Sequence, residues 1–587
     1  MTNCRSRIAI GLVLVCLAGI EGLAQAPAPK KTNHAEEAAV FERIFNRARF
    51  ENDGTSVEEA EASIVIQSEA GVKEFGQLVF GYSSATEKLD VEYVRVRKPD
   101  GQVVVTPDST AQDFAPEVVK EAPMYTDFRE RHISVAALRP GDTLEYRTVT
   151  RTTTPLAGDN FWYVHTFPKG IVVTEDRLEV DVPKGREIKL KTPAHTPEIQ
   201  EHGDRRIYTW VVKGIEPERD RYKDEDADEA TGPDVQLTTF TDWKQIARWY
   251  AELQGERMTV DDTVRKQAED LTKGATTPEE KARRLYNFVA LDIRYVSISL
   301  GVGRYQPHAA AEILQDGYGD CKDKHTLLAA MLKVVGIQSY PVLIDSARKL
   351  DEDEPSPAQF DHVMTLARVG QKFTWLDATQ EVTPYGLLLY QLRNKQAVVA
   401  AEGAEGGLQR TPSDSPISTF MRFVVEGKFS EYGALDATVE FTAQGDRDWP
   451  MRAGFRSVPQ ARWSDFTKML SASWGFPGDI DNVEGHRQRG GGPDRGYVET
   501  VPSEVSRPPG QVFRGTGGER GFPADSAAGG ARGARLEQEH GADRYWSGGR
   551  NGLQGTAGIS GKLYRAYAAC GEDDAGLRRV FIDLFFR

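Results

Sequence analysis

The period of the hydrophobic residues changes twice along this chain, and these changes constrain the fold more than any other feature. From about residue 60 to 220 apolar and polar residues alternate, as in Val91-Glu92-Tyr93-Val94-Arg95-Val96, which is typical of half-buried strands. From Asp242 onward apolar residues recur at helical spacing, and beyond Val382 short strands return. The order predicts an α+β protein with β-rich regions on both sides of a helical one.

The composition excludes several classes of protein. The 587 residues carry a formal net charge of −15 and no basic cluster, which argues against a nucleic-acid or anionic-membrane surface, because such partners need a concentrated positive field. With 39% hydrophobic and 27% charged residues, the chain has the make-up of a folded globular protein rather than a disordered one.

Residues 1–26 have the layout of a secretory signal peptide. Two arginines precede an apolar run at 8–20, and small residues follow at Ala24 and Ala26, where cleavage would occur. The run is too short to span a bilayer comfortably, and the chain has no second run of about 18 apolar residues. We therefore expect an exported protein, periplasmic or extracellular, with no transmembrane span after cleavage; an uncleaved N-terminal anchor is the alternative.

The remaining chain divides into regions with different hydrophobic patterns and compositions. In residues 27–59 a stripe at Val40, Phe41, Ile44 and Phe45 predicts a short helix after a spacer. The other expected units are a β-rich domain at 60–222, an acidic linker at 223–240, a catalytic domain at 241–395 and a C-terminal β domain at 396–485.

The segment 486–587 is rich in glycine and arginine, has Lys562 as its only lysine, and follows neither structural period. One interpretation is a disordered low-complexity tail. The interpretation we favour is a frameshifted reading of GC-rich coding DNA, which would leave the C-terminal β domain incomplete. Translation of the other two frames downstream of Glu484 tests this hypothesis.

One cysteine remains once the ends are set aside. Cys4 and Cys16 leave with the signal peptide, and Cys570 lies in the suspect tail, so Cys321 has no partner for a disulfide. The turn 317–320 precedes it, and apolar residues recur at helical spacing after it.

This position suits a nucleophile. Asp320 is a natural N-cap, so Cys321 falls in the first helical turn, where the helix dipole and the neighbouring Lys322 and Lys324 favour the thiolate. The alternative is a small apolar residue in a buried helix, but a helix start beside charged residues is a poor apolar site.

A nucleophilic cysteine needs a histidine base and a group that orients it. Downstream, His362 and Asp377 lie on two expected strands. If residues 370–371 form a two-residue loop, Val369 pairs with Lys372, and Asp377 becomes a diagonal neighbour of His362 on one face. A three-residue loop would place the two side chains on opposite faces.

Three segments carry a family resemblance: Gly319-Asp320-Cys321-Lys322-Asp323-Lys324, Phe360-Asp361-His362 and Trp375-Leu376-Asp377-Ala378-Thr379. They resemble the Cys, His and Asp motifs of the transglutaminase-like superfamily, whose core is papain-like, and the preceding β domain is similar to an uncharacterised domain that many secreted bacterial members carry. The resemblance implies a Cys-bearing helix packed on an antiparallel sheet that bears His and Asp. It further implies Cys321 as nucleophile, His362 as general base and then acid, and Asp377 as the residue that orients the imidazole.

The sequence identifies the oxyanion donors less clearly than the Cys, His and Asp residues. The backbone N–H of Cys321 is one candidate, and the family resemblance implies a second donor upstream, for which Tyr295 and Gln306 are the candidates. His325 is a rival base or metal ligand, but its surroundings lack any familiar zinc spacing, so no metal is expected. His308 follows Pro307 in a loop and is interpreted as structural.

These features predict an exported enzyme that acts on protein or peptide amides through a thioacyl intermediate, with no cofactor. Water would resolve the intermediate by hydrolysis, and a primary amine would resolve it by acyl transfer. The alternative is a non-catalytic peptide-binding module on a papain-like scaffold, and a zinc-dependent hydrolase is a weaker third hypothesis. The oligomeric state is left open.

Overall fold

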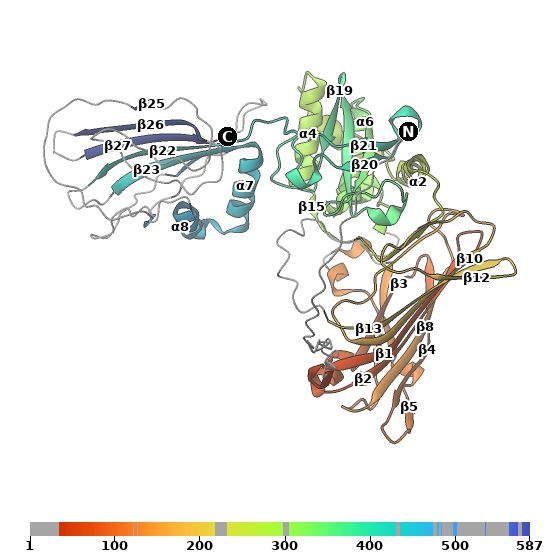
Figure 1. Cartoon of the computed structure of the whole chain (residues 1–587). Coiled ribbons are helices and arrows are strands. Elements are labelled where there is room, and N and C mark those ends of the chain that lie inside the picture. Colours follow the sequence, from red (N-terminus) through yellow and green to blue (C-terminus); the bar gives the residue numbers. More distant parts are fainter. Residues whose placement is uncertain are drawn as a thin grey trace, which may run out of the picture.

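The protein is described by a computed structural model (Figure 1). It describes residues 34–120, 122–125, 127–217, 232–297, 304–429, 435–473, 478–480 and 483, and the backbone of strands at 497–501, 534–535, 563–572 and 578–586. The predicted signal peptide lies outside these residues.

An eight-stranded sheet dominates the N-terminal region, in the order β12-β13-β10-β1-β2-β8-β4-β5. Its strands are β1 (Ala39–Phe50), β2 (Ser56–Ile66), β4 (Glu87–Arg97), β5 (Val103–Val105), β8 (Thr143–Thr152), β10 (Val173–Pro183), β12 (Glu198–His202) and β13 (Arg205–Ile215). The helix α1 (Glu69–Phe75) follows β2, and short 3₁₀ turns lie at His34–Glu36, Asp108–Thr110, Glu117–Lys120 and Pro123–Tyr125.

Two three-stranded sheets pack against this large sheet. One joins β3 (Gln77–Ser83), β7 (Phe128–Ser134) and β6 (Ala111–Phe114); the other joins β11 (Lys189–Lys191), β14 (Val235–Thr238) and β9 (Trp162–His165). The first buries Ile64 and Leu144, and the second buries Phe50, Leu178 and Trp210. Alternation along the strands thus puts one apolar face into each core.

The helix expected near residue 40 is wrong, because residues 39–50 form β1, which pairs antiparallel with β2 and parallel with β10. The register shifts between Phe41 and Arg43, so Phe41 faces Ile64 and Ile44 faces Ala62. A β-bulge therefore puts two apolar residues three positions apart on one face, and this spacing imitates a helix.

The central region packs five helices on one antiparallel sheet. The helices are α2 (Trp243–Gly255), α3 (Asp262–Thr272), α4 (Pro278–Leu291), α5 (Ala310–Asp316) and α6 (Cys321–Val334). The sheet runs β19 (Lys372–Leu376), β18 (His362–Val369), β17 (Ser339–Ile344), β20 (Gln396–Val399), β21 (Gly407–Arg410), and a short parallel pair joins β15 (Arg294–Tyr295) to β16 (Tyr318–Gly319).

Helix α6 lies at the centre of this region. Leu327, Leu328 and Met331 are fully buried in a cluster that also takes side chains from α3, α4, α5 and the sheet. A 3₁₀ turn at Pro357–Gln359 precedes β18, and others lie at Tyr390–Leu392 and Gly403–Glu405. The Cys-bearing helix thus packs on the antiparallel sheet, as the family resemblance implied.

Two expected boundaries need correction. The linker expected at 223–240 contains β14, which pairs with β9 and β11 because its four residues are buried against the N-terminal sheet. The catalytic domain expected to end at residue 395 continues through β20 and β21, because Val399 pairs with Val342 and completes the central sheet. Residues 223–231 of the expected linker lie outside the described part, as do residues 218–222 before it.

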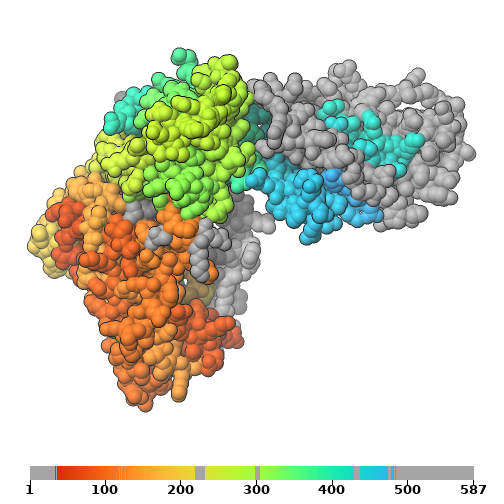
Figure 2. All heavy atoms as spheres, turned by 180° about the vertical axis from the view of Figure 1, so that it is seen from behind, coloured from red at the N-terminus to blue at the C-terminus, as the bar shows by residue number. Residues whose placement is uncertain are grey.

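The N-terminal and central regions are packed together (Figure 2). Trp249 of α2 stacks obliquely near Trp162 of β9, with ring centroids 5.7 Å apart, and its Nε1 donates to the Leu156 carbonyl at 2.8 Å. Lys191 of β11 forms an ion pair with Asp351 of the central region. The interface therefore combines apolar rings with satisfied polar groups.

The C-terminal region is not purely β. It contains α7 (Asp448–Ser457) and α8 (Trp463–Ser473), a 3₁₀ turn at Gly445–Arg447 and another at Gln460–Arg462. Its sheet runs β24 (Tyr497–Val501), β23 (Leu435–Gln444), β22 (Phe420–Phe429), β27 (Arg578–Phe586), β26 (Leu563–Glu572), β25 (Ala534–Arg535).

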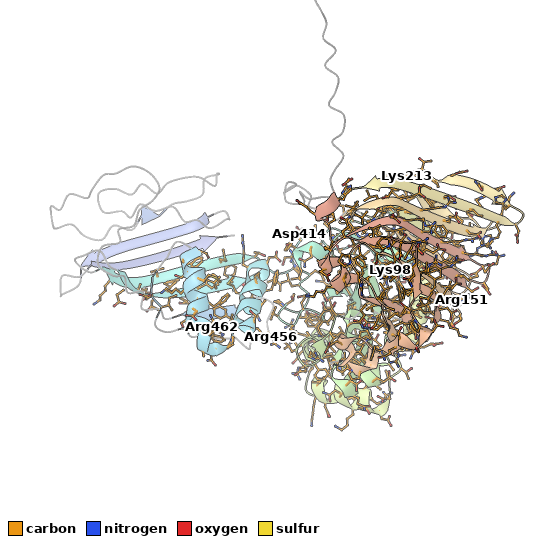
Figure 3. All side chains as sticks on the ribbon, turned by 90° about the horizontal axis from the view of Figure 1, so that it is seen from below. Lys98, Arg151, Lys213, Asp414, Arg456 and Arg462 are labelled. Carbon is orange, nitrogen blue, oxygen red and sulfur yellow. The ribbon has the colours of Figure 1, made fainter. Side chains whose placement is uncertain are left out.

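Figure 3 shows Arg456 and Arg462 on the α7–α8 arm, apart from Lys98 and Arg151 of the N-terminal sheet, and Arg456 pairs with Glu381 of the central region at 2.7 Å.

Part of the expected low-complexity tail is therefore in strands. The run Val580-Phe581-Ile582-Asp583-Leu584-Phe585-Phe586 is rich in β-branched and aromatic residues, and it pairs with β22 from Met421 to Phe429. The composition of the whole segment concealed this local signal. The frameshift hypothesis stays a prediction about the coding DNA.

No helix among the described residues combines the length and the apolar character that crossing a membrane would need.

Deletion of Glu42 should be tolerated, because it removes the extra residue of the bulge and leaves a regular strand in which Phe41 still faces Ile64 and keeps its edge-on contact with Phe75 at 5.8 Å. We expect a loss of less than about 1 kcal/mol in the free energy of unfolding followed by circular dichroism. The control is deletion of Asn46, in the regular part of the same strand, which turns the side chains on one side of the gap to the other face of the sheet and should cost about 2 kcal/mol. Equal losses for the two deletions would contradict the bulge assignment.

Candidate active site

The start of α6 places Cys321 in the first helical turn. Asp320 is the N-cap, and its side chain accepts from the backbone N–H groups of Lys322 at 3.1 Å and Asp323 at 3.2 Å. A Cβ on Gly319 would lie 2.6 Å from the Asp323 Cβ, so only glycine allows the chain to pass this close to the helix. The predicted N-cap is confirmed.

The hairpin that carries His362 and Asp377 has the expected even loop. Val369 pairs with Lys372, and Gly370 has a φ of 62°, which suits the first position of a two-residue turn. His362 Nε2 lies 3.1 Å from Asp377 Oδ2. The register prediction is therefore confirmed, and the two side chains meet on one face.

Thr379 holds Asp377 in place. Its backbone N–H and its hydroxyl both donate to Asp377 Oδ1, at 3.0 Å and 2.7 Å. The second oxygen remains for His362, so Thr379 fixes the orientation of the carboxylate independently of the imidazole. Asp377 is only 2% exposed, and it is satisfied on both oxygens.

The electrostatics favour a charged pair. Burial alone would lower the pKa of His362, but the Asp377 carboxylate and Cys321 outweigh burial and hold this pKa well above 6.5. Burial would likewise raise the pKa of Asp377, yet His362 and Thr379 keep it below its usual value. Both shifts favour the charged forms, an imidazolium and a carboxylate.

The Cys321 side chain is half-buried, and Cys321 is the one free cysteine among the residues whose side chains are described. It packs at the edge of an apolar cluster that includes Trp249, Tyr250 and Phe360. Because Asp377 occupies Nε2 of His362, the ring's Nδ1 remains for an interaction with the sulfur. Cys321, His362 and Asp377 are thus brought together from α6, β18 and the end of β19.

Two tyrosine hydroxyls lie in the electrostatic environment of the sulfur. Burial raises the pKa of Tyr295, and the negative charge of Cys321 raises it further. Tyr250 is 1% exposed, its hydroxyl has no hydrogen-bond partner in the described structure, and its pKa is raised by burial and then by Cys321. Tyr295 is one of the oxyanion donors that the sequence predicts, and Tyr250 is not.

The two lysines beside Cys321 differ in their relation to the sulfur. Lys322 forms a buried ion pair with Asp320 and, as expected, also interacts electrostatically with Cys321. Lys324 points the other way, where its Nζ donates to the carbonyls of Ala290 at 3.3 Å and Ile293 at 2.7 Å, near the C-terminal end of α4. The expectation that Lys324 favours a thiolate is therefore wrong, because packing directs its side chain away from the sulfur.

Gln306 pairs with Arg257: when its amide is oriented to satisfy both groups, the carbonyl oxygen accepts from Nη2 at 2.6 Å and Nε at 3.1 Å. This pairing engages only the carbonyl oxygen, so Gln306 stays a candidate oxyanion donor through its NH2 group.

His325 is a core residue. Its Nδ1 contacts Thr365 Oγ1 at 2.7 Å, its Nε2 has no partner among the described residues, and burial lowers its pKa to about 3. It is a neutral buried ring, separate from the His362–Asp377 pair.

The N-terminal domain also reaches this site, which sequence reasoning missed. Tyr125, in a 3₁₀ turn of that domain, is fully buried, and its hydroxyl donates to Asp323 Oδ2 at 2.5 Å. His308 contacts the same carboxylate through Nδ1 at 3.2 Å. A signal did exist in the unusual run of charged residues after Cys321, but Tyr125 lies 198 positions away from Asp323 in the chain.

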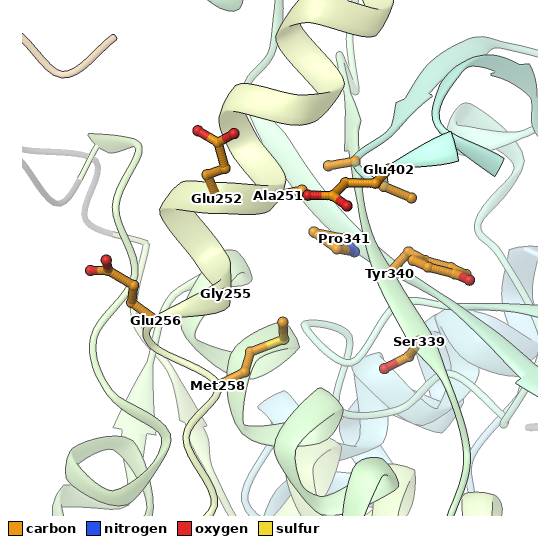
Figure 4. Close-up of a pocket in the computed structure, with 11 residues that line it drawn as sticks. Ala251, Glu252, Gly255, Glu256, Met258, Ser339, Tyr340, Pro341 and Glu402 are labelled. Carbon is orange, nitrogen blue, oxygen red and sulfur yellow. The ribbon is translucent and has the colours of Figure 1, made fainter. Parts of the chain in front are cut away.

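A hollow of about 570 Å³ lies elsewhere on the central region (Figure 4). It opens between the end of α2 and the edge of β17, and its lining includes Glu252, Glu256 and Glu402. None of the three triad candidates lines it.

Family models match both parts of the chain. Residues 52–219 match the "Domain of Unknown Function with solved-structure structure (DUF3857)", and residues 265–377 match the Transglutaminase-like superfamily. The chain therefore carries a DUF3857 domain ahead of a core that belongs to the Transglutaminase-like superfamily. None of the curated proteins matches the chain in sequence.

A solved structure shares the overall architecture. A Parabacteroides distasonis protein named "putative protease" superposes with a TM-score of 0.55 at 14% identity, over 94% of this chain and 93% of that one. At this identity the similarity establishes the fold alone. A "putative cysteine protease" from Cytophaga hutchinsonii matches at 11% identity over 38% of this chain and 71% of its own, with a TM-score of 0.19, too low to support an argument.

Asp377→Asn should remove a pH-dependent part of the stability. Because the folded-state pKa of His362 is raised above 6.5, the charged ring stabilises the fold fully below pH 6.5, and this contribution is lost as pH rises through the raised value. We expect the variant to be less stable by roughly 1.5–3 kcal/mol near pH 5.5, with a smaller difference at high pH, in urea unfolding.

Asp270→Asn is the matched control, since it removes an exposed pair with Lys266 and should change little at either pH. A difference between wild type and Asp377→Asn that does not vary with pH would contradict the charged-pair assignment.

Proposed function

We propose that this protein is a cysteine-dependent enzyme that cleaves or transfers the acyl group of protein or peptide amides. The observation that carries the proposal is the His362 Nε2 to Asp377 hydrogen bond of 3.1 Å, with the other ring nitrogen left for Cys321 at the start of α6. A nucleophile, a base and a group that orients the base are the three parts such chemistry requires.

In the proposed reaction the Cys321 sulfur attacks the carbonyl carbon of the amide while its proton resides on His362. A C–S bond forms, and the carbonyl oxygen becomes an oxyanion. When this tetrahedral intermediate collapses, the C–N bond breaks, and His362 gives its proton to the leaving amine. A thioester remains on Cys321, and Asp377 stabilises the imidazolium in both steps.

A second nucleophile then resolves the thioester. Water yields a carboxylic acid, and a primary amine yields a new amide; in either case His362 accepts the proton of the incoming group, and the thiol is released. Thiol, imidazole and carboxylate supply all of this chemistry, so the mechanism needs no cofactor.

The oxyanion would be held by the backbone N–H of Cys321 and by a tyrosine hydroxyl. Tyr295 is the leading candidate, because its neutral, raised-pKa hydroxyl is a hydrogen-bond donor in the field of Cys321. Tyr250 is a second candidate on the same ground, with a hydroxyl that lacks a partner among the described residues.

The proposed substrates are peptides or proteins outside the cytoplasm. The export signal at residues 1–26 and the division of the chain at the expected boundaries, as corrected above, are part of this proposal. The acidic balance of −15 argues against nucleic acid as a partner.

The test is to incubate the full-length protein with a peptide library, with and without a primary amine, and to identify products by mass spectrometry. Cys321→Ala should abolish product formation, and His362→Ala should lower it about 10²–10⁴-fold, because each removes one part of the relay. His202→Ala is the matched histidine control, since His202 is exposed on β12 and should be silent.

Products that persist in Cys321→Ala would refute the cysteine mechanism. Peptide binding without any turnover in the wild type would instead support the non-catalytic binding module.

A further inference from the structure

We propose that Tyr125 of the N-terminal domain is a positioning residue for the nucleophile, so that the active site is completed across two domains. This inference rests on the proposed function, because it assigns a role to a group that acts on Cys321. It gives the DUF3857 region a part in the chemistry.

The Tyr125 hydroxyl forms hydrogen bonds with both ends of the first turn of α6. It donates to Asp323 Oδ2 at 2.5 Å and accepts from the backbone N–H of Asp320 at 3.0 Å. The residue is fully buried, so water does not compete for these bonds. One hydroxyl thus connects the residue before Cys321 to the residue two positions after it.

This arrangement completes a reciprocal cap. The Asp320 side chain accepts from the N–H groups of Lys322 and Asp323, and the Asp323 side chain accepts from the N–H of Asp320 at 3.3 Å. The Asp320 N–H therefore donates to two acceptors, the Asp323 carboxylate and the Tyr125 hydroxyl. Cys321 lies inside this ring of bonds, so the direction of its N–H and of its Cα–Cβ bond depends on the ring.

The rest of the segment is held by the same cluster. His308 Nε2 lies 3.1 Å from the Met124 carbonyl, and the Met124 N–H donates to the Tyr318 hydroxyl at 3.1 Å. The rings of Tyr125 and His308 meet edge to face with centroids 4.9 Å apart. The titratable groups that face the Tyr125 hydroxyl and its partners are Asp320, Lys322, Asp323 and His308. Cys321, Tyr250 and Tyr295 also interact electrostatically with residues of this cap.

Loss of the hydroxyl would not undock the domains. The contacts of Trp249 with Trp162 and with the Leu156 carbonyl, and the Lys191–Asp351 pair, are made elsewhere on the interface. Tyr125→Phe keeps the ring and its packing and removes only the two bonds to the cap. The variant therefore separates positioning from domain attachment.

The experiment measures the rate of Cys321 alkylation by iodoacetamide between pH 5.5 and 9.5 in the full-length protein, by mass spectrometry of the Cys321 peptide. At low pH the rate depends on how well Cys321 is aligned with His362, whereas at high pH the thiolate forms without the histidine. We expect Tyr125→Phe to react roughly tenfold more slowly than wild type at pH 6 and within about twofold of it at pH 9.5.

Peptide turnover is measured in parallel. In Tyr125→Phe we expect kcat to fall roughly tenfold while KM stays within about twofold, because the alignment of the nucleophile changes and substrate contacts do not. Tyr208→Phe is the matched control: Tyr208 is a buried tyrosine of the same domain whose hydroxyl interacts with Arg206, and its variant should match wild type in both assays.

A Tyr125→Phe profile equal to that of wild type would overturn the proposal, and so would a uniform slowing at every pH. If Tyr125→Phe does not fold, as judged by its circular dichroism, Asp323→Asn takes its place with the same expectation and the same overturning results. If wild type turns over no peptide yet the alkylation profile of Tyr125→Phe still shifts, the proposed function fails and the positioning role stands.

Discussion

The buried reciprocal cap at the start of α6 is the interaction on which the rest of the structure depends. Asp320, Lys322 and Asp323 are each at most 2% exposed, and three charges can be buried together only if every one is paired or hydrogen-bonded. The partners come from the cap itself, from Tyr125 of the N-terminal domain and from His308 of the loop before α5. Because these buried charges need partners, the N-terminal and central regions contact each other at the start of α6, beside the nucleophile.

The hairpin β18–β19 meets this cap from the opposite side. Its two-residue loop sets the register, the register puts His362 and Asp377 on one face, and Thr379 orients the carboxylate. Because α6 packs directly on the sheet, packed elements of regular secondary structure carry both the imidazole and the sulfur. A helix cap and a strand register, both local features, thus converge on one site.

Sequence reasoning succeeded where the determining interactions are short-range and failed where they are not. The N-cap at Asp320 and the pairing of Val369 with Lys372 depend on a few neighbouring residues, and both were predictable. The strand β1 was misread because a bulge at Glu42 changes its period, and this bulge exists only against β2. Strands β20 and β27 were misassigned because their pairing partners, β17 and β22, lie far away in the chain.

The sequence by itself determined the class of the core and the three residues of the candidate triad, because residue type and spacing already specify a cysteine at a helix start and a His–Asp hairpin. Only the tertiary structure decided where the charges beside Cys321 go. Lys324 turns to the end of α4, Lys322 pairs with Asp320, and Tyr125 closes the cap from another domain. A buried charge takes whichever partner the packing brings within hydrogen-bond distance, and separation along the chain does not reveal that partner.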